Sequence, residues 1–449
     1  MSRDFDFVVI GATVGGLAAA GMLTKGGARV LLVEEKLAPP EPRGAVFALD
    51  PALVTDLKLV QQGLAFTRND LTLTGWDEEE PPLALSRDRR ASARAIARLS
   101  DADAEAWSAF QAELFARGRA LRRWWGSPHR DGAAAEMLWQ PGERLRFARE
   151  CVCGAADLLA RHFESPRLIG TVLHDAVSGA LSPTEPGSAL ALVWRAAQEM
   201  AGQQAASALC EPGSLVAAMR KASGARLELG AAVTEILVAR GAAVGVSLDD
   251  GERIGARAVL SSLPRARSER LAGLERPDET GAVGEAQLVL SLAEGFDLPA
   301  PLRHGRCVSA LAPEDYADAH EAARAGRLPP LSPYAVVAEG VRRLIVTLPL
   351  MPVAPAEGWP ALEAKLAAGI VKSLGRNLPG LARSLTGVTV LRPKRRPRPS
   401  LAHLLAPALV RAATHVPGLY LCGDDAEPLP CVSGRAGRFA AHFATKPTS

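Results

Sequence analysis

The sequence has little of several features that would point to particular classes of protein. Its formal net charge is only +3 over 449 residues, too small a surplus to indicate nucleic-acid binding. Six cysteines are too few for a disulfide scaffold, and the eight histidines show no metal-ligand spacing. No apolar run approaches the ~20 residues of a membrane span, and the first residues lack the apolar core of a signal peptide. We therefore expect a cytoplasmic protein without a metal site.

Hydrophobic residues, by contrast, are plentiful. They make up 48% of the chain, which excludes a mostly disordered protein. At this length we expect roughly two or three domains. Trp124-Trp125, at the end of a helical pattern that begins at Asp101, most simply packs into the interior, and the alternative is a peripheral contact with the inner face of a membrane.

The opening residues carry the strongest local pattern. Residues 5–10 form a short apolar run typical of a buried strand, and Gly11-Ala12-Thr13-Val14-Gly15-Gly16 follows it directly. Residues 17–23 suit a helix packed on a sheet, and residues 29–33 form a second apolar strand that ends at Glu34. This order of a strand, a glycine turn, a helix, a second strand and an acidic residue within about 30 residues predicts the βαβ unit of a dinucleotide-binding fold.

The glycine turn indicates how a dinucleotide would be held. Glycine lets the backbone approach a pyrophosphate, and the N-terminus of the following helix supplies N–H donors and a positive dipole end. Gly16 permits tight packing of the helix on the strand. Glu34 stands where a carboxylate can accept both hydroxyls of the adenosine ribose, and Glu35 takes that role if the strand runs one residue longer.

Thr13 departs from this pattern because it replaces the glycine at which the backbone comes closest to phosphate. Its branched side chain would crowd a pyrophosphate unless the loop opens slightly or the hydroxyl itself donates to phosphate. Nucleotide binding remains our preferred interpretation. The alternative is a doubly wound sheet that has lost its nucleotide.

The C-terminal part returns to the same kind of pattern. Residues 418–422 predict a strand, Gly423-Asp424 a turn, and residues 434–443 a helix. A late Gly-Asp of this kind is similar to the element that carries the ribityl chain in FAD enzymes of the glutathione-reductase type. NAD has no ribityl chain for this element to bind, so we expect FAD.

Several segments together resemble the phytoene desaturase / carotenoid isomerase-like branch of the flavin amine oxidase superfamily. The resemblance extends over nearly the whole chain, and its segments are residues 101–110, 211–215, 227–264, 313–333 and 418–425. It implies an α/β fold in which an FAD-binding, Rossmann-like domain carries an inserted α+β substrate or cap domain. The FAD-binding domain would comprise residues 1–75, 210–275 and 400–449, and the cap residues 76–209 and 276–399.

The resemblance also implies an activity and a set of site residues. The chain would be an FAD-dependent oxidoreductase, of desaturase or isomerase type, that acts on a hydrophobic, isoprenoid or polyene molecule such as a carotenoid. Carried over by position, the FAD-binding residues are Gly11, Thr13, Gly15, Gly16, Glu34, Arg43, Val233, Gly423, Asp424 and Val432. Val233 would pair its backbone with the adenine, and Val432 would lie near the isoalloxazine ring.

Three departures from the family pattern fall on flavin contacts. They are Thr13, the single Arg43-Gly44 where the family has Gly-Gly-Arg, and Leu429-Pro430-Cys431 where it has glycines against the ring. They motivate an alternative hypothesis, a cofactor-free binding or scaffold protein that keeps the fold.

No acid–base pair stands out in the sequence. Glu427 is a weak candidate, and we expect His174 to be a hydrogen-bonded histidine of a helix. Flavin chemistry does not require such a pair, because the cofactor itself accepts the hydride. The catalytic residues, the electron acceptor and the oligomeric state are therefore left unassigned.

Overall fold

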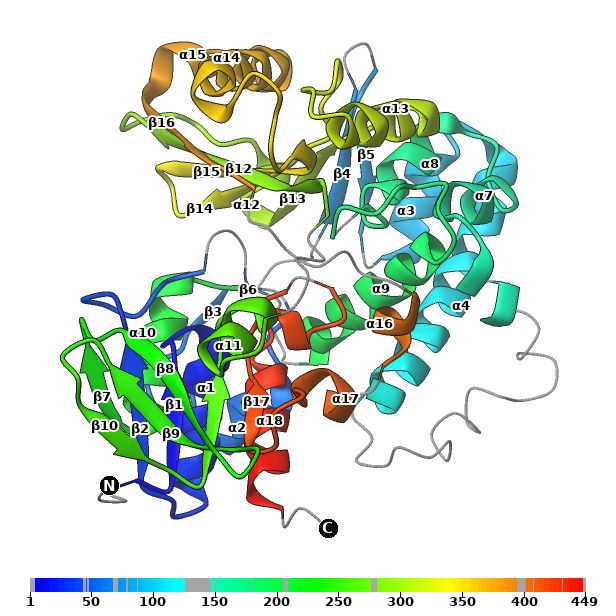
Figure 1. The fold of residues 1–449 in the computed structure, drawn as a ribbon. Coiled ribbons are helices and arrows are strands. Elements are labelled where there is room, and N and C mark those ends of the chain that lie inside the picture. Colours follow the sequence, from blue (N-terminus) through cyan, green and yellow to red (C-terminus); the bar gives the residue numbers. More distant parts are fainter. Residues whose placement is uncertain are drawn as a thin grey trace.

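The computed structural model describes residues 5–42, 46, 48–67, 72–77, 80–86, 88–125, 147–149, 151–177, 179–204, 209–275, 281–393, 401–406, 408–429 and 431–446. Two lobes are visible in Figure 1, each built on its own sheet. The lower lobe holds the first and last strands of the chain, and the upper lobe holds strands from the middle. Arg43 and Pro430 lie outside the described residues.

The sheet of the lower lobe has five parallel strands in the order β17-β11-β1-β2-β7. These strands are β1 (Phe7–Ile10), β2 (Val30–Glu34), β7 (Arg226–Leu229), β11 (Ala258–Ser261) and β17 (Leu419–Leu421). Every residue of β1 and β2 is buried, as expected for parallel strands covered on both faces. The βαβ unit predicted from the opening residues is present.

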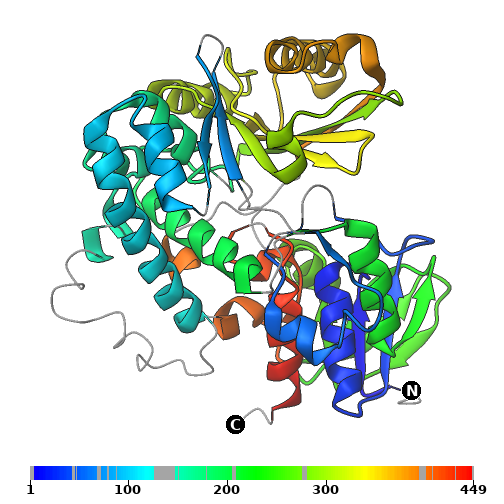
Figure 2. The ribbon, with the colours of Figure 1, turned by 180° about the vertical axis from the view of Figure 1, so that it is seen from behind.

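The alternation of side chains along β1 explains the two layers that cover this sheet. Phe7 and Val9 pack against α1 (Val14–Lys25), α10 (Pro212–Ser223) and α18 (Arg435–Thr445). Val8 and Ile10 pack on the other face, against a three-stranded antiparallel sheet. Its strands are β8 (Val233–Ala239), β9 (Ala242–Leu248) and β10 (Arg253–Gly255). Figure 2 shows α1 and α10 in front of the five-stranded sheet.

The upper lobe, which we call the cap, is built on a seven-stranded mixed sheet of order β16-β12-β15-β14-β13-β4-β5. Its strands are β4 (Thr72–Trp76), β5 (Leu83–Leu85), β12 (Val283–Leu292), β13 (Gly305–Ser309), β14 (Ala335–Glu339), β15 (Arg343–Pro352) and β16 (Leu385–Leu391). Leu366, Ile370 and Leu374 of α14 (Trp359–Asn377) pack on this sheet at the spacing of one helix face.

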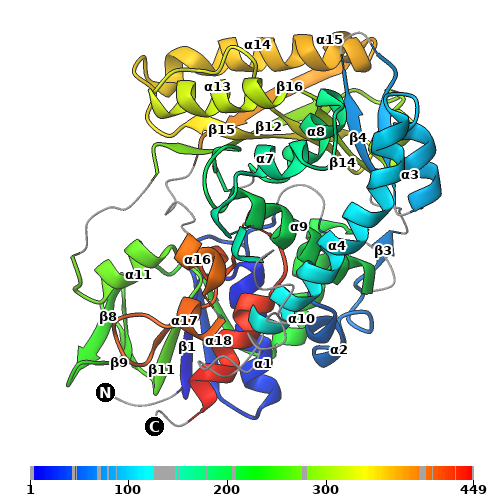
Figure 3. The same ribbon diagram turned by 90° about the vertical axis from the view of Figure 1, so that its right-hand side faces the viewer.

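Two long helices connect the lobes. α4 (Asp101–Trp125) and α9 (Ser188–Gln204) pack side by side and extend from the cap sheet to the lower lobe (Figure 3). Trp125 at the end of α4 is fully buried, and Trp124 Nε1 donates to Leu405 O at 2.7 Å. Trp125 therefore lies in the interior, and the half-buried Trp124 is tied to the end of α16 (Leu401–Leu405).

The remaining elements are short. They are α2 (Pro51–Asp56), α3 (Arg89–Ile96), α7 (Ala155–Ala160), α8 (Pro166–Leu173), α11 (Arg265–Leu271), α12 (Ala300–His304), α13 (Pro313–Arg324), α15 (Leu381–Ser384), α16 (Leu401–Leu405), α17 (Ala408–Ala412), β3 (Phe66–Thr67), β6 (Leu209–Cys210) and the 3-10 turn Asp424–Ala426. Among the helices of the described segments, none combines the length and apolar character needed to cross a bilayer. The exact domain boundaries remain a prediction.

Candidate functional site

The glycine turn between β1 and α1 closes tightly on itself. Gly11 has a φ of +85°, which favours glycine, and its carbonyl accepts a hydrogen bond from Ser262 Oγ at 3.1 Å. A Cβ on Gly16 would lie 1.9 Å from Gly11 O. These two glycines therefore allow the turn to form and α1 to start close above β1.

Thr13 occupies the N-cap position of α1, with an extended backbone, and its Oγ1 accepts a hydrogen bond from Gly16 N at 3.3 Å. Threonine is a favourable residue there, since its hydroxyl satisfies one of the N–H groups that a helix leaves without acceptors. The N–H groups of Val14 and Gly15 belong to the same first turn and have no intrahelical acceptor. Thr13 thus takes up one donor of the turn and leaves two for an anion.

Glu34 reaches the turn from the end of β2. Its carboxylate is buried, and it accepts hydrogen bonds from Ala12 N at 2.7 Å and Lys36 N at 3.1 Å. Glu35 lies at the surface and pairs with Arg267 at 3.1 Å. The structure therefore brings Glu34, and not Glu35, to the glycine turn.

Val233 lies at the start of β8, two residues after Ala231, whose segment contacts the end of β2. Gly230 N donates to Glu34 O at 2.8 Å and Ala231 N donates to the same oxygen at 3.3 Å. The backbone of Val233 pairs with Leu248 in the three-stranded sheet, and its side chain is buried. The predicted ribose and adenine contacts thus come from neighbouring segments.

The C-terminal segment packs directly against the glycine turn. A Cβ on Gly15 would lie 1.9 Å from Cys422 O, and one on Gly437 would lie 2.0 Å from Gly15 O. A Cβ on Gly423 would lie 2.4 Å from Ser262 O. Glycine at these positions lets backbone meet backbone, so the carboxyl ends of β1, β11 and β17 lie close together at one edge of the sheet.

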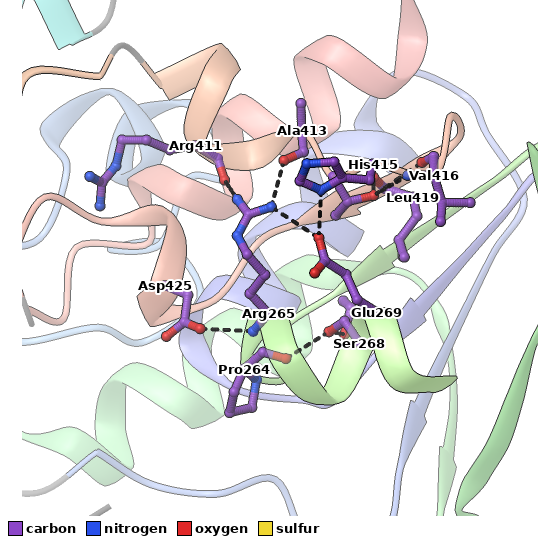
Figure 4. A network of polar contacts seen from close by, with 12 residues as sticks. Pro264, Arg265, Ser268, Glu269, Arg411, Ala413, His415, Val416, Leu419 and Asp425 are labelled. Carbon is purple, nitrogen blue, oxygen red and sulfur yellow. Dashed lines mark hydrogen bonds and ion pairs between the residues drawn. The ribbon is translucent and has the colours of Figure 1, made fainter. Parts of the chain in front are cut away.

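The two aspartates after β17 differ in their surroundings. Asp424 is exposed, whereas Asp425 Oδ2 accepts a hydrogen bond from Arg265 N at 2.7 Å, at the start of α11. The Arg265 guanidinium donates to Arg411 O at 2.7 Å and to Ala413 O at 2.9 Å, as Figure 4 shows. This network ties α11 and the end of α17 to the turn that carries Asp424.

Arg411 extends from α17 toward the same segment. It is 3% exposed, and its Nε donates to Ala426 O at 2.9 Å. Its Nη2 has no hydrogen-bond partner among the described residues. Burial lowers the pKa of this guanidinium to about 9. Sequence reasoning missed both Arg265 and Arg411, because nothing in their local patterns marks them.

Glu427 caps the last helix. Its carboxylate accepts hydrogen bonds from Ser433 Oγ and from Ala436 N at 3.0 Å, and Cys431 Sγ lies 3.7 Å away. Burial raises the pKa of Glu427 and raises that of the Cys431 thiol well above its ordinary value. The thiol is therefore held in its protonated, weakly nucleophilic form. Val432 is half-buried beside it.

Leu429 is 1% exposed and belongs to the core shared by α1, α9 and α18. Its carbonyl accepts a hydrogen bond from Gln198 Nε2 at 3.3 Å. Gln198 lies on α9, so this bond links the segment after β17 to the cap. Two of the three family departures, Thr13 and Leu429, thus have local structural roles.

A cavity of about 90 Å³ lies in the cap between α4, α8, α9 and the strands β4 and β5. Its walls are mainly apolar, but Asp175 and Arg195 also line it. Asp175 forms a two-pronged ion pair with Arg306, whose Nη2 lies 2.6 Å from Oδ2, and a contact of 3.5 Å with Arg195. Despite its burial, these cations lower the pKa of Asp175 to about 2.

His174, next to this ion cluster, corrects one expectation. It is 4% exposed, and neither ring nitrogen has a hydrogen-bond partner among the residues described. We expected a hydrogen-bonded histidine, which is wrong, because the ring is enclosed at the end of α8 and forms no hydrogen bond with the charged groups nearby. Burial lowers its pKa to about 3, so the ring is neutral.

Two curated proteins and several solved structures are similar to this chain over almost its whole length. No model of a protein family matches the chain. The Mus musculus protein named pyridine nucleotide-disulfide oxidoreductase domain-containing protein 2 is 25% identical over 98% of this chain and 93% of its own length. The Rattus norvegicus protein of the same name is 25% identical over 99% of this chain and 94% of its own.

Solved structures share the fold over almost the whole chain. An oxidoreductase from Methanosarcina mazei has a TM-score of 0.61 at 16% identity and covers 97% of this chain and 99% of its own. A putrescine oxidase with redesigned cofactor binding has a TM-score of 0.62 at 15% identity, and cyclohexylamine oxidase from Brevibacterium oxydans has 0.55 at 15%; each match covers 98% of both chains. The predicted fold class, a Rossmann-like domain of the glutathione-reductase type with an inserted α+β domain, is confirmed.

Proposed function

We propose that this chain is an FAD-dependent oxidoreductase that acts on a hydrophobic small molecule. The observation that carries the proposal is the close approach of the glycine turn, Glu34 and the Gly423 segment at one edge of the five-stranded sheet. The names of the rat and mouse relatives and the amine oxidases among the structural neighbours support an oxidoreductase. Bound FAD would supply an acceptor for a hydride from the substrate.

The residues at this edge of the sheet fit the ADP part of FAD. The N–H groups of Val14 and Gly15 would bind the pyrophosphate at the start of α1. Glu34 would accept hydrogen bonds from the ribose hydroxyls in place of those it now accepts from Ala12 N and Lys36 N. Arg411, whose Nη2 is buried without a partner, adds a cation that remains charged at neutral pH on the side of the C-terminal segment.

The hydrophobic substrate follows from the cap. Its cavity has mostly apolar walls, and the cap contacts the C-terminal segment through Gln198 and Leu429. We extend the proposal to a desaturase or isomerase acting on an isoprenoid or polyene molecule, as the resemblance to the phytoene desaturase branch implies. Such a reaction fits a site without an acid–base pair, since the chain then only orients the substrate and excludes water.

A second candidate is a cofactor-free binding or scaffold protein with the same fold. Thr13 favours it, because its hydroxyl already occupies the Gly16 N–H that would otherwise be open to a phosphate. The packing of Leu429 into the core, where the family has a glycine against the flavin ring, favours it as well.

Titration of the purified protein with FAD, followed by flavin fluorescence, tests the proposal. We expect saturable binding and the visible absorption band of a bound oxidised flavin. Glu34→Gln weakens binding by about tenfold, since a charge-assisted hydrogen bond to the ribose is lost. Glu35→Gln is the matched control and leaves the affinity unchanged, because Glu35 faces solvent beside Arg267. A wild-type protein that binds no FAD would reject the proposal in favour of the second candidate.

A further inference from the structure

The turn after β17 that carries Asp424 has little internal support. It is a single 3-10 turn, Asp424–Ala426. Ala426 N donates to Gly423 O at 3.1 Å, and Glu427 N donates to Asp424 O at 3.0 Å. One turn of this kind is not stable by itself, because two hydrogen bonds do not offset the cost of fixing its backbone. Contacts with other elements must therefore hold the turn in place.

Asp425 joins this turn to the first residue of α11. Pro264 precedes α11, and its side chain offers no acceptor for the N–H groups of the first helical turn. Asp425 Oδ2 supplies an acceptor from a segment 160 residues away, and it accepts a hydrogen bond from Arg265 N at 2.7 Å. The carboxylate thus caps α11, and α11 in return fixes Asp425.

The guanidinium of Arg265 supports the turn by a second route. Its Nη2 donates to Arg411 O at 2.7 Å and its Nη1 donates to Ala413 O at 2.9 Å, at the end of α17 (Figure 4). The Arg411 side chain in turn donates from Nε to Ala426 O at 2.9 Å. Ala426 is the last residue of the turn. Arg265 therefore acts on the turn through Arg411 as well as through Asp425.

Glu269 keeps the Arg265 side chain in this position. It lies one helical turn further along α11 and is buried, and its Oε1 lies 3.5 Å from Arg265 Nη1 and 3.1 Å from His415 Nδ1. Two carbonyl groups and a carboxylate in different directions match the forked, planar donors of a guanidinium. A lysine has one compact ammonium in place of these separated donors, so it cannot keep all three contacts.

We propose that Arg265 is a positioning residue, which holds the Asp424 turn in the arrangement that binds the ribityl chain of FAD. The inference rests on the proposed FAD-dependent function. The glycine turn and Glu34, which would hold the ADP part, form their hydrogen bonds with Ala12, Lys36 and Ser262. Loss of the Arg265 side chain should therefore affect the flavin part of the cofactor and spare its ADP part.

Comparison of FAD with ADP tests the proposal on the full-length protein. FAD binding is followed by flavin fluorescence and ADP binding by titration calorimetry, for the wild type and for Arg265→Met. Methionine keeps an unbranched side chain but has no donor. We expect FAD binding to weaken about tenfold, the loss that follows when the turn is ordered in about one molecule in ten. The affinity for ADP should stay within about twofold, whereas a general loosening of the lobe would weaken both ligands.

Two further variants serve as controls. Arg267→Met changes the same residue type on the same helix and leaves both affinities unchanged, because Arg267 is exposed and pairs with Glu35 at 3.1 Å. Arg265→Lys keeps the charge but not all of the contacts, so its FAD affinity should lie between those of the wild type and Arg265→Met.

Hydrogen exchange of the cofactor-free protein tests the same contacts without FAD. Arg265→Met should speed the exchange of the Ala426 and Glu427 amides by about tenfold, because the two hydrogen bonds of the turn then open in most molecules. The amides of β1 and β2, which lie between other strands of the sheet, should keep their rates.

The outcomes are distinct. Unchanged FAD affinity in Arg265→Met, or an equal loss of FAD and ADP affinity, overturns the proposal. If Arg265→Met does not fold, Asp425→Ala decides in its place, because it breaks the other contact between α11 and the turn and should give the same selective loss of FAD. FAD binding that does not depend on Arg265 would leave the proposed function standing. A wild-type protein that binds no FAD would reject the proposed function and the flavin role of Arg265, and faster exchange in Arg265→Met would then show a structural role alone.

Discussion

Acid should destabilise this protein through His174 at pH values where most carboxylates are still ionised. The ring is 4% exposed and unpartnered, and its pKa in the folded chain is about 3. In the unfolded chain the same group titrates near its ordinary value of 6.5. Between these two values the unfolded state binds a proton that the folded state does not, so stability falls as the pH falls through this window.

The size of the effect follows from the two pKa values. Each pH unit within the window costs about 1.4 kcal/mol for one such group. From about pH 8 to about pH 5 the free energy of unfolding should therefore fall by about 2 kcal/mol through His174 alone, because only the final one and a half units lie below the unfolded pKa. Below about pH 3 this contribution stops growing, since the folded ring then also takes up a proton.

Urea unfolding of the wild type and His174→Leu at both pH values measures this contribution. At about pH 8 we expect the variant to be no less stable, since leucine fills the space of a neutral ring whose nitrogens make no hydrogen bonds. At about pH 5 the variant should be more stable than the wild type by about 2 kcal/mol. His442→Gln, on the exposed side of α18, should retain most of the acid sensitivity. Identical pH dependence of wild type and His174→Leu would refute the reasoning.

Three further substitutions test other parts of the structure. Gly437→Ala places a Cβ 2.0 Å from Gly15 O and forces α18 away from α1. We expect the free energy of unfolding, measured with urea, to fall by about 3 kcal/mol. An unchanged stability would contradict the close packing of the two helices. Asp175→Asn leaves two guanidinium groups without their carboxylate and should lower the free energy of unfolding by about 3–5 kcal/mol at neutral pH. Because the pKa of Asp175 in the folded chain is about 2, the difference in stability between wild type and variant in urea unfolding should persist as the pH falls toward 4 and disappear only below that. Thr13→Gly should cost only a few tenths of a kcal/mol in stability. It should tighten FAD binding in a fluorescence titration, since it opens the glycine turn and frees the Gly16 N–H. Weaker binding would show that the threonine hydroxyl itself holds phosphate.

The sequence predicts the parts of the fold whose signals are local. The βαβ unit at the N-terminus depends on an apolar run, a glycine turn and a second run within about 30 residues, which is a short-range pattern. The hairpin between β9 and β10 follows from Asp249-Asp250-Gly251, where Gly251 has a φ of +87°. The helix predicted from Asp101 to Trp125 is present with those bounds.

Contacts between distant parts of the chain were not predictable in the same way. Arg265 meets Asp425 across 160 residues and Ala413 across 148, so no local pattern signals them. The cap cavity likewise combines residues of α4, α8 and α9, and it appears only when these helices are placed together. His174 shows the limit most clearly, because the identity of a polar residue does not reveal whether a partner lies within reach.

The strand order of the lower sheet has a consequence for how the protein is made. β1 pairs with β11, β11 pairs with β17, and α18 covers α1, so the first and the last described elements are neighbours. During synthesis from the N-terminus, β1 and α1 emerge about 400 residues before the strand and helix that complete their surroundings. The part of the lower lobe where the glycine turn meets the Gly423 segment thus forms from segments of very high sequence separation, which is a slow step in folding. A ligand that needs all of these segments can bind only after β17 and α18 have been synthesised and have packed against β11 and α1.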